Sequence, residues 1–149
     1  WKVSAFDQSI AGQAKALALA AKHQVTIDYE VGEFQDIKYQ PEQFDAIALI
    51  YAHFPADKKA EYNQQLAKYL KPGGTILFEA FSKRHLEYNS VNPKVGGPKE
   101  EGMLFFIEEL KTYFHDFDII ELKEEEIELH EGSYHNGKGS VIRFIGKKK

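Results

Sequence analysis

The sequence predicts an α/β protein in which helices cover both faces of a mostly parallel β-sheet, a three-layer α/β/α arrangement with an antiparallel hairpin at its C-terminal end. Strand-length apolar stretches alternate with helical patterns over the first 81 residues, which is typical of parallel strands joined by crossover helices. One stretch is almost continuously apolar, as in a strand buried on both faces. The last third of the chain instead has alternating segments separated by turn-forming residues, which indicates a hairpin.

The first elements are predicted to be a strand, a helix and a strand. Residues 1–6 (WKVSAF) carry apolar and β-branched residues and stop at Asp7, as expected of a short strand. Ser9 is a favoured helix N-cap, and small apolar residues recur after it at helical spacing. Residues 25–31 (VTIDYEV) alternate between apolar and polar and end at Gly32, which predicts a second strand and a loop.

The middle of the chain continues this alternation. Residues 44–51 (FDAIALIY) are the almost continuous apolar run, which predicts a central parallel strand. Apolar residues at helical spacing then predict a helix over 57–70 that ends at the turn 71–74 (KPGG). Residues 75–81 (TILFEAF) are predicted to form the next buried strand.

The part of the chain after this strand begins with residues 82–102, which are rich in Lys, Asn, Pro and Gly and too long for a simple connector. We expect an irregular segment over the sheet edge, of the kind that often forms a lid. A short helix over 106–114 and a strand over 117–122 follow. Residues 126–130 and 140–146 alternate around several turn formers, Gly132 to Gly139, and predict the antiparallel hairpin.

Composition limits the functions that remain. A length of 149 residues, 43% of them hydrophobic, predicts one domain with a sizeable core. The net charge of −4 argues against a nucleic-acid partner. We expect no membrane partner and no secretion, because no apolar run approaches the ~20 residues of a membrane span and no leader pattern opens the sequence. The absence of Cys excludes disulfides, thiolate nucleophiles and cysteine zinc sites, and it is compatible with a cytoplasmic location.

Acidic residues follow the first two predicted strands, at the sheet edge where ligands of open α/β sheets bind. Asp7 can accept two hydrogen bonds from the hydroxyls of a ribose, or it can be a negative charge at the start of the next helix. Glu33 and Phe34 can offer a carboxylate and an apolar face to an adenine, or they can be solvated loop residues.

Several of these features together carry a family resemblance. An acid-ended strand, an acidic-apolar pair after the second strand, a strand that starts with FDAI and the turn KPGG resemble the class I S-adenosylmethionine-dependent methyltransferases. The strings IYAHFP, LKPGGTILFEAFSK and HEGSYHNGKGSVIRFIG look like a small bacterial branch similar to the tellurite-resistance type. The resemblance covers residues 1–146. It implies a Rossmann-like fold, S-adenosylmethionine as cofactor with S-adenosylhomocysteine as product, and methyl transfer to an acceptor that we expect to be a small molecule.

The resemblance assigns cofactor-binding positions after three strands. They are the ribose-binding acid with its neighbour, the adenine-contacting pair, and the segment beside the methionine moiety and the methyl group: Asp7 and Gln8, Glu33 and Phe34, and Tyr51 and Ala52.

The family's first strand and glycine-rich loop should lie before Trp1. The resemblance therefore implies that residues 1–149 are a single domain that is incomplete at its N-terminus. The loss of that strand would leave backbone groups of the strands over 1–6 and 44–51 unpaired. The segment 95–98 (VGGP) does not replace the loop, because it follows no strand-to-helix pattern.

The catalytic candidates are His53 and Tyr51, which follow the central strand. His53 can act as a general base or orient the acceptor, or it can only shape the pocket, while Tyr51 can position the methyl group or the acceptor. A dedicated base is not required, because displacement at a sulfonium starts from an activated donor. The candidates for the acceptor pocket are Phe54, Glu79, Phe81, Tyr134 and His135.

The other histidines suggest no metal site. His130 and His135 flank the hairpin turn, but their spacing fits no strong ligand pattern. His23, His85 and His115 are predicted to be surface or loop residues.

Two other functions stay open. A nicotinamide-dependent oxidoreductase shares the strand-end acid, although the terminal hairpin and the KPGG turn argue against it. A non-catalytic nucleoside-binding or scaffold relative is the second alternative. The sequence carries no signal for an oligomeric state.

Overall fold

A computed structural model of the chain describes residues 1–132 and 134–149. They form two compact units, Trp1–Tyr39 and Gln40–Lys149. Ser133, within the predicted hairpin turn, lies outside the described residues. No helix in the described part of the chain is long and apolar enough to cross a membrane.

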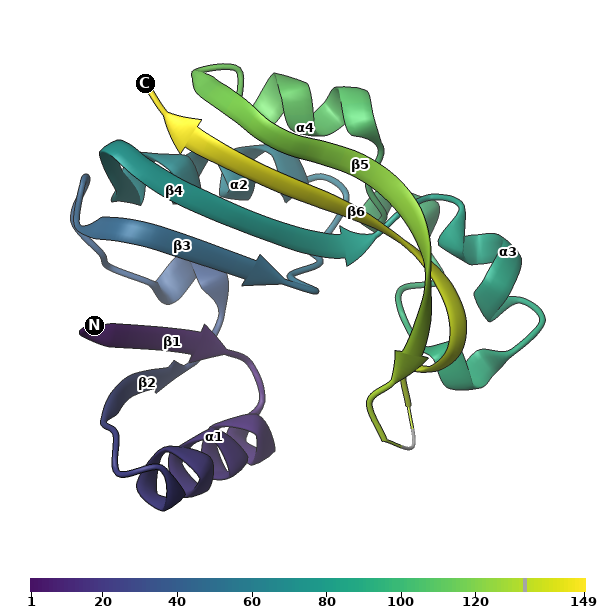
Figure 1. Ribbon diagram of the computed structural model, residues 1–149, viewed down its shortest axis with the longest axis horizontal. Coiled ribbons are helices and arrows are strands. Elements are labelled where there is room, and N and C mark those ends of the chain that lie inside the picture. Colours follow the sequence, from purple (N-terminus) through teal and green to yellow (C-terminus); the bar gives the residue numbers. More distant parts are fainter. Residues whose placement is uncertain (133) are drawn as a thin grey trace. The chain divides into compact units, whose positions relative to one another are not determined.

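The first unit contains two parallel strands and one long helix (Figure 1). Ser9 caps the helix as predicted, because its Oγ accepts a hydrogen bond from the Gly12 amide at 2.9 Å. Gln13 of the helix donates to the Tyr29 carbonyl at 2.8 Å and so ties the helix to the second strand. The elements are β1 (Val3–Asp7), α1 (Ile10–Lys22), β2 (Ile27–Val31) and the 3-10 turn η1 (Phe34–Asp36).

The second unit is built on a mixed sheet with the strand order β3-β4-β6-β5. The strands β3 and β4 are parallel, whereas β6 is antiparallel to both of its neighbours. In Figure 1, the last two strands form a long bent hairpin that continues beyond the end of β4. The bounds are β3 (Phe44–Ile50), β4 (Leu70–Phe81), β5 (Phe117–His130) and β6 (Asn136–Lys148).

Helices α2 (Lys59–Tyr69) and α4 (Ile107–Tyr113) lie together behind this sheet (Figure 1). Large aromatic side chains fill the space between the layers, and the rings of Phe114 and Phe144 stack at 5.0 Å. A buried ion pair of 2.6 Å joins Lys59 of α2 to Glu109 of α4. The second unit therefore has an apolar core, and the Lys59–Glu109 ion pair joins the two helices that pack on it.

The segment after β4 is more ordered than the sequence predicted. It contains α3 (His85–Asn89) and the 3-10 turns η2 (Pro93–Val95) and η3 (Glu101–Met103). Val95 is fully buried with Phe81 of β4 and with residues of the hairpin. The predicted irregular segment is therefore anchored to the core of the second unit.

Two predictions about the last third were wrong. Residues 117–122 and 126–130 are not separate strands, because β5 is continuous. The charged residues between them interrupt the apolar alternation, but their backbones stay paired with β6, and Glu125 forms an ion pair with Arg143 across the sheet. His85 is not a surface residue, since it is fully buried.

Candidate functional site

Three polar side chains meet at the carboxyl ends of β1 and β2. The Asp7 Oδ1 accepts a hydrogen bond from the Ser9 amide at 2.7 Å, which fixes the carboxylate at the start of α1. The Gly32 amide donates to the Asp7 carbonyl at 3.2 Å, so the ends of the two strands stay together. Beside them, Gln8 Nε2 donates to Glu33 Oε2 at 2.8 Å.

These residues fit an adenosine group. The Asp7 carboxylate is exposed, and an ionised carboxylate only accepts hydrogen bonds, which suits the two hydroxyls of a ribose. The Glu33 carboxylate offers a second acceptor that suits an amino group. Phe34 is only 8% exposed, so little of its ring is open to a ligand.

In the second unit, the end of β3 turns sharply at Tyr51. This residue has a φ of 51°, a left-handed conformation that is uncommon for an aromatic residue. Its amide donates to the Glu79 carbonyl at 2.7 Å, and its hydroxyl donates to the Glu79 carboxylate at 3.0 Å. Its ring lies 4.8 Å from that of Phe81. Backbone strain of this kind persists where several contacts hold it, and it concentrates at functional sites.

Glu79 joins Tyr51 to a charge network on the sheet. Its carboxylate accepts from Arg143 Nε at 2.5 Å, and Arg143 also pairs with Glu125. Burial, and then the negative charge of Glu79, raise the pKa of Tyr51. The Tyr51 hydroxyl therefore keeps its proton at neutral pH and acts as a donor, not as a base.

Both ring nitrogens of His53 are bonded to the backbone. The Met103 carbonyl lies 2.9 Å from Nδ1 and can only accept, so Nδ1 carries the proton. The Phe81 amide then donates to Nε2 at 3.3 Å. Burial lowers the pKa of His53 to about 4, so the ring is neutral near pH 7. This arrangement suits a residue that holds Phe81 better than a residue that removes protons.

His135 reaches the same place from the hairpin. The β5–β6 pairing continues to His130 and Asn136, beyond the last pair of β4, Phe81 with Val141. The hairpin thereby brings the His135 ring to 5.1 Å from Tyr51 and 5.4 Å from Phe81.

His85 completes the group, with its ring stacked 3.8 Å from Phe81. Its Nε2 donates to the Gly96 carbonyl at 3.0 Å, and its Nδ1 accepts from the Ser140 amide at 3.3 Å. Burial lowers its pKa. The sequence analysis missed this residue, although His85 and Asn89 stand four residues apart, the spacing of one helical face, and both are buried on α3. We call the five residues Tyr51, His53, Phe81, His85 and His135 the aromatic cluster.

The other predicted site residues of the second unit are not members of the aromatic cluster. The Phe54 ring packs edge-on against Tyr62 of α2 at 5.2 Å. Tyr134 is 75% exposed, and Ala52 is a partly buried residue between Tyr51 and His53. Among the described residues, no group of three or more His, Cys, Asp or Glu side chains is arranged to hold a metal ion.

Comparison with known proteins gave a family and a fold. A family model described as a methyltransferase domain matches residues 1–74, about half of the chain. A search of curated proteins found no match.

The chain is similar to solved structures at low sequence identity. TehB from Haemophilus influenzae is 18% identical with a TM-score of 0.73, over 100% of this chain and 50% of that chain. An S-adenosylmethionine-dependent methyltransferase from Methanosarcina mazei is 16% identical with a TM-score of 0.70, over 99% of this chain and 82% of that chain. A putative methyltransferase from Bacillus halodurans is 18% identical with a TM-score of 0.68, over 99% and 83% of the two chains.

The TM-scores of 0.68 to 0.73 establish the fold, a Rossmann-like α/β arrangement. The chain spans only half the length of the Haemophilus protein.

Proposed function

We propose that the chain is a class I S-adenosylmethionine-dependent methyltransferase that transfers a methyl group from S-adenosylmethionine to a small-molecule acceptor; the methyltransferase-domain match over residues 1–74 and the shared fold support this proposal. When bound, this cofactor supplies a methyl group that is already activated on a sulfonium. The protein then has to bind the nucleoside, align the acceptor and exclude water. The resemblance to the tellurite-resistance type is supported by the TehB match.

The observation that carries the proposal is the fixed carboxylate at the end of β1. The Ser9 amide holds Asp7 at 2.7 Å, and the Gln8–Glu33 hydrogen bond lies beside it. In the proposal, Asp7 binds the ribose hydroxyls, while Gln8 and Glu33 contact the base.

The residues after β3 have a different role in the proposal. Tyr51 and Ala52 lie along the methionine moiety and the methyl group, and His53 is a positioning residue. The bonds of His53 to Met103 and Phe81 support this role, since they leave the ring no free nitrogen. A positioning role at this place is sufficient, because the sulfonium donor needs no further activation.

Replacement of Asp7 tests the proposal. Asp7→Asn retains the shape of the side chain and an oxygen for the Ser9 amide, but it removes the charge. A hydrogen bond to a charged group contributes about 1.5–3 kcal/mol, so we expect S-adenosylhomocysteine to bind the full-length protein at least about tenfold more weakly. Calorimetric titration measures this change.

The matched control is Asp28→Asn, which removes the same charge near the other end of β2. Its affinity should stay within about twofold of the unmodified protein. Unchanged binding by Asp7→Asn, or an equal loss in both variants, would remove Asp7 from the proposed site.

A further inference from the structure

We propose that His135, oriented by Glu131, is the base that receives a proton from the acceptor, and that the acceptor is a neutral molecule with an O–H, N–H or S–H group. This inference rests on the proposed methyl transfer and names the class of its acceptor. It begins from the contrast between His135 and the other two histidines of the aromatic cluster.

His135 has the hydrogen bond that a catalytic base needs. Its Nδ1 lies 2.9 Å from a carboxylate oxygen of Glu131. Because an ionised carboxylate can only accept, Nδ1 carries the proton and Nε2 has the lone pair. The backbone occupies both nitrogens of His53 and His85. Within the described residues, His135 is the histidine of the cluster whose Nε2 has no hydrogen-bond partner.

Local structure holds the His135 ring in place. The Glu131 amide donates to the His135 carbonyl at 2.9 Å and joins the two ends of the hairpin turn. Asn92 Nδ2 donates to the Asn136 carbonyl at 3.1 Å, which ties the hairpin to the segment before η2. Gly96 makes room for the ring, since a Cβ there would lie 2.8 Å from His135 Cδ2.

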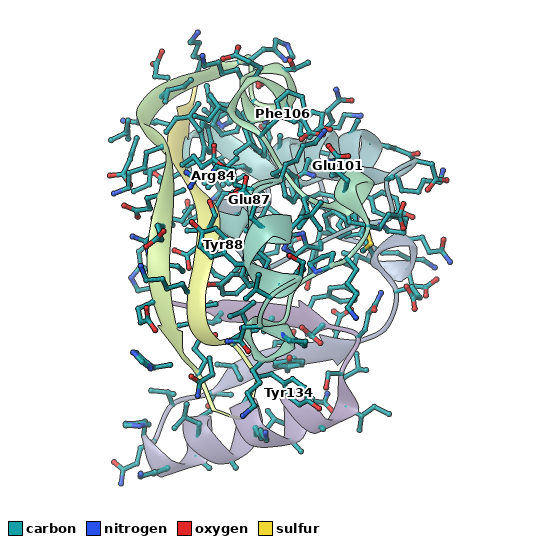
Figure 2. All side chains as sticks on the ribbon, turned by 90° about the vertical axis from the view of Figure 1, so that its right-hand side faces the viewer. Arg84, Glu87, Tyr88, Glu101, Phe106 and Tyr134 are labelled. Carbon is teal, nitrogen blue, oxygen red and sulfur yellow. The ribbon has the colours of Figure 1, made fainter. Side chains whose placement is uncertain are left out.

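The hairpin around this residue is braced along its length. Figure 2 shows α3, with Arg84, Glu87 and Tyr88 labelled, beside the strand that leads from Tyr134 at the tip. Tyr88 donates to Glu126 of β5 at 2.8 Å, and Lys138 of β6 pairs with the same carboxylate at 2.7 Å. His135 is therefore presented by a supported element.

The charges around His135 favour a neutral acceptor. The titratable groups that face it are Glu131, Tyr51, His53 and His85. Burial lowers the pKa of both histidines, and Tyr51 keeps its proton, so Glu131 is the charged member at neutral pH.

Behind Tyr51, Arg143 is paired with two carboxylates. In the described part of the cluster no unpaired cation is present to hold an oxyanion. The partly exposed ring of Tyr51 suits an acceptor with an aromatic or apolar body, whereas Phe81 is buried and supports that ring from behind.

The chemical step balances with these groups. A lone pair of the acceptor heteroatom forms the bond to the methyl carbon, while the electron pair of the S–C bond goes to the sulfur, which becomes a neutral thioether. The proton of the acceptor moves to His135 Nε2, and Glu131 stabilises the imidazolium. Solvent later removes this proton.

Methylation assays with chemically defined probes test the inference. The full-length protein is given S-adenosylmethionine with phenol, benzyl mercaptan or benzimidazole as protic probes, and with selenite or tellurite as oxyanions. Formation of S-adenosylhomocysteine is followed by mass spectrometry. We expect transfer to at least one protic probe and a loss of about 100-fold or more in kcat for His135→Gln. The control His115→Gln, at a histidine outside the cluster, should retain normal turnover.

Glu131→Gln separates a proton-transfer role from a structural one. Glu131→Gln keeps the shape of the side chain but removes the charge that stabilises the imidazolium, so kcat for the protic probes should fall while their KM stays unchanged. A purely structural effect, which displaces the His135 ring, would raise the KM for the probes as well.

The inference is overturned by normal protic turnover in His135→Gln, by transfer to the oxyanions alone, or by no transfer to any protic probe in a protein that binds S-adenosylhomocysteine. Loss of S-adenosylhomocysteine binding altogether would instead overturn the proposed function on which it rests.

Discussion

Mild acid is expected to destabilise the second unit through His53. In the folded chain both ring nitrogens are bonded to the backbone, and burial lowers the pKa of His53 from 6.5 to about 4. At a pH between these two pKa values, the His53 ring therefore binds a proton in the unfolded chain but not in the folded chain. Stability is complete above about pH 6.5 and falls as the pH drops toward about 4.

The size of the effect follows from the two pKa values. With 6.5 in the unfolded chain and about 4 in the folded chain, the free energy of unfolding decreases by about 2 kcal/mol on going from about pH 8 to about pH 5. This is an upper value, because the His53 side chain is partly exposed to solvent. Burial of His85 acts in the same direction.

Urea unfolding followed by far-UV circular dichroism at the two pH values measures this effect. His53→Gln should lose a large part of the pH dependence, whereas His115→Gln should keep it, since His115 is exposed. Equal stability of the unmodified protein at both pH values, or a full pH dependence in His53→Gln, would refute the argument.

Two further changes test the packing around the cluster. Lys59→Met removes the cation paired with the largely buried Glu109, which keeps only its hydrogen bonds from Tyr113 and Phe106, and should cost about 3 kcal/mol in urea unfolding. Lys111→Met breaks an exposed pair and should cost under about 1 kcal/mol, and similar losses in the two variants would contradict the burial argument. Gly97→Ala combines a φ of 80° with a Cβ 2.8 Å from an aromatic ring, so it should destabilise the protein by more than about 1 kcal/mol, and more than Gly132→Ala, whose Cβ meets open space.

The order of the elements up to β4 could be predicted because most of them left a local pattern, although β4 already begins at Leu70 and contains the predicted turn 71–74. The run 44–51 and the cap at Ser9 became β3 and the start of α1. The single strand β5 was missed because its middle residues are charged on both faces. Lys123 pairs with Glu125 within β5, and Arg143 of β6 pairs with the same Glu125 across the sheet; local periodicity carries no information about such partners.

The candidate site could be predicted only in part, because some of its contacts follow from the order of the strands and others do not. Tyr51 and Phe81 end neighbouring parallel strands, so their proximity follows from topology. The burial of His85 depends on the Gly96 carbonyl and the Ser140 amide, which come from two distant segments. A single sequence does not reveal contacts of this kind, and the role of a histidine depends on them.

The most direct test of the account is a calorimetric titration of the full-length protein with S-adenosylhomocysteine, run beside NADH and with the intact mass recorded. We expect micromolar binding of S-adenosylhomocysteine and no binding of NADH. Binding of NADH alone would contradict it in favour of an oxidoreductase, and a folded full-length protein that binds neither compound would contradict it in favour of a non-catalytic relative.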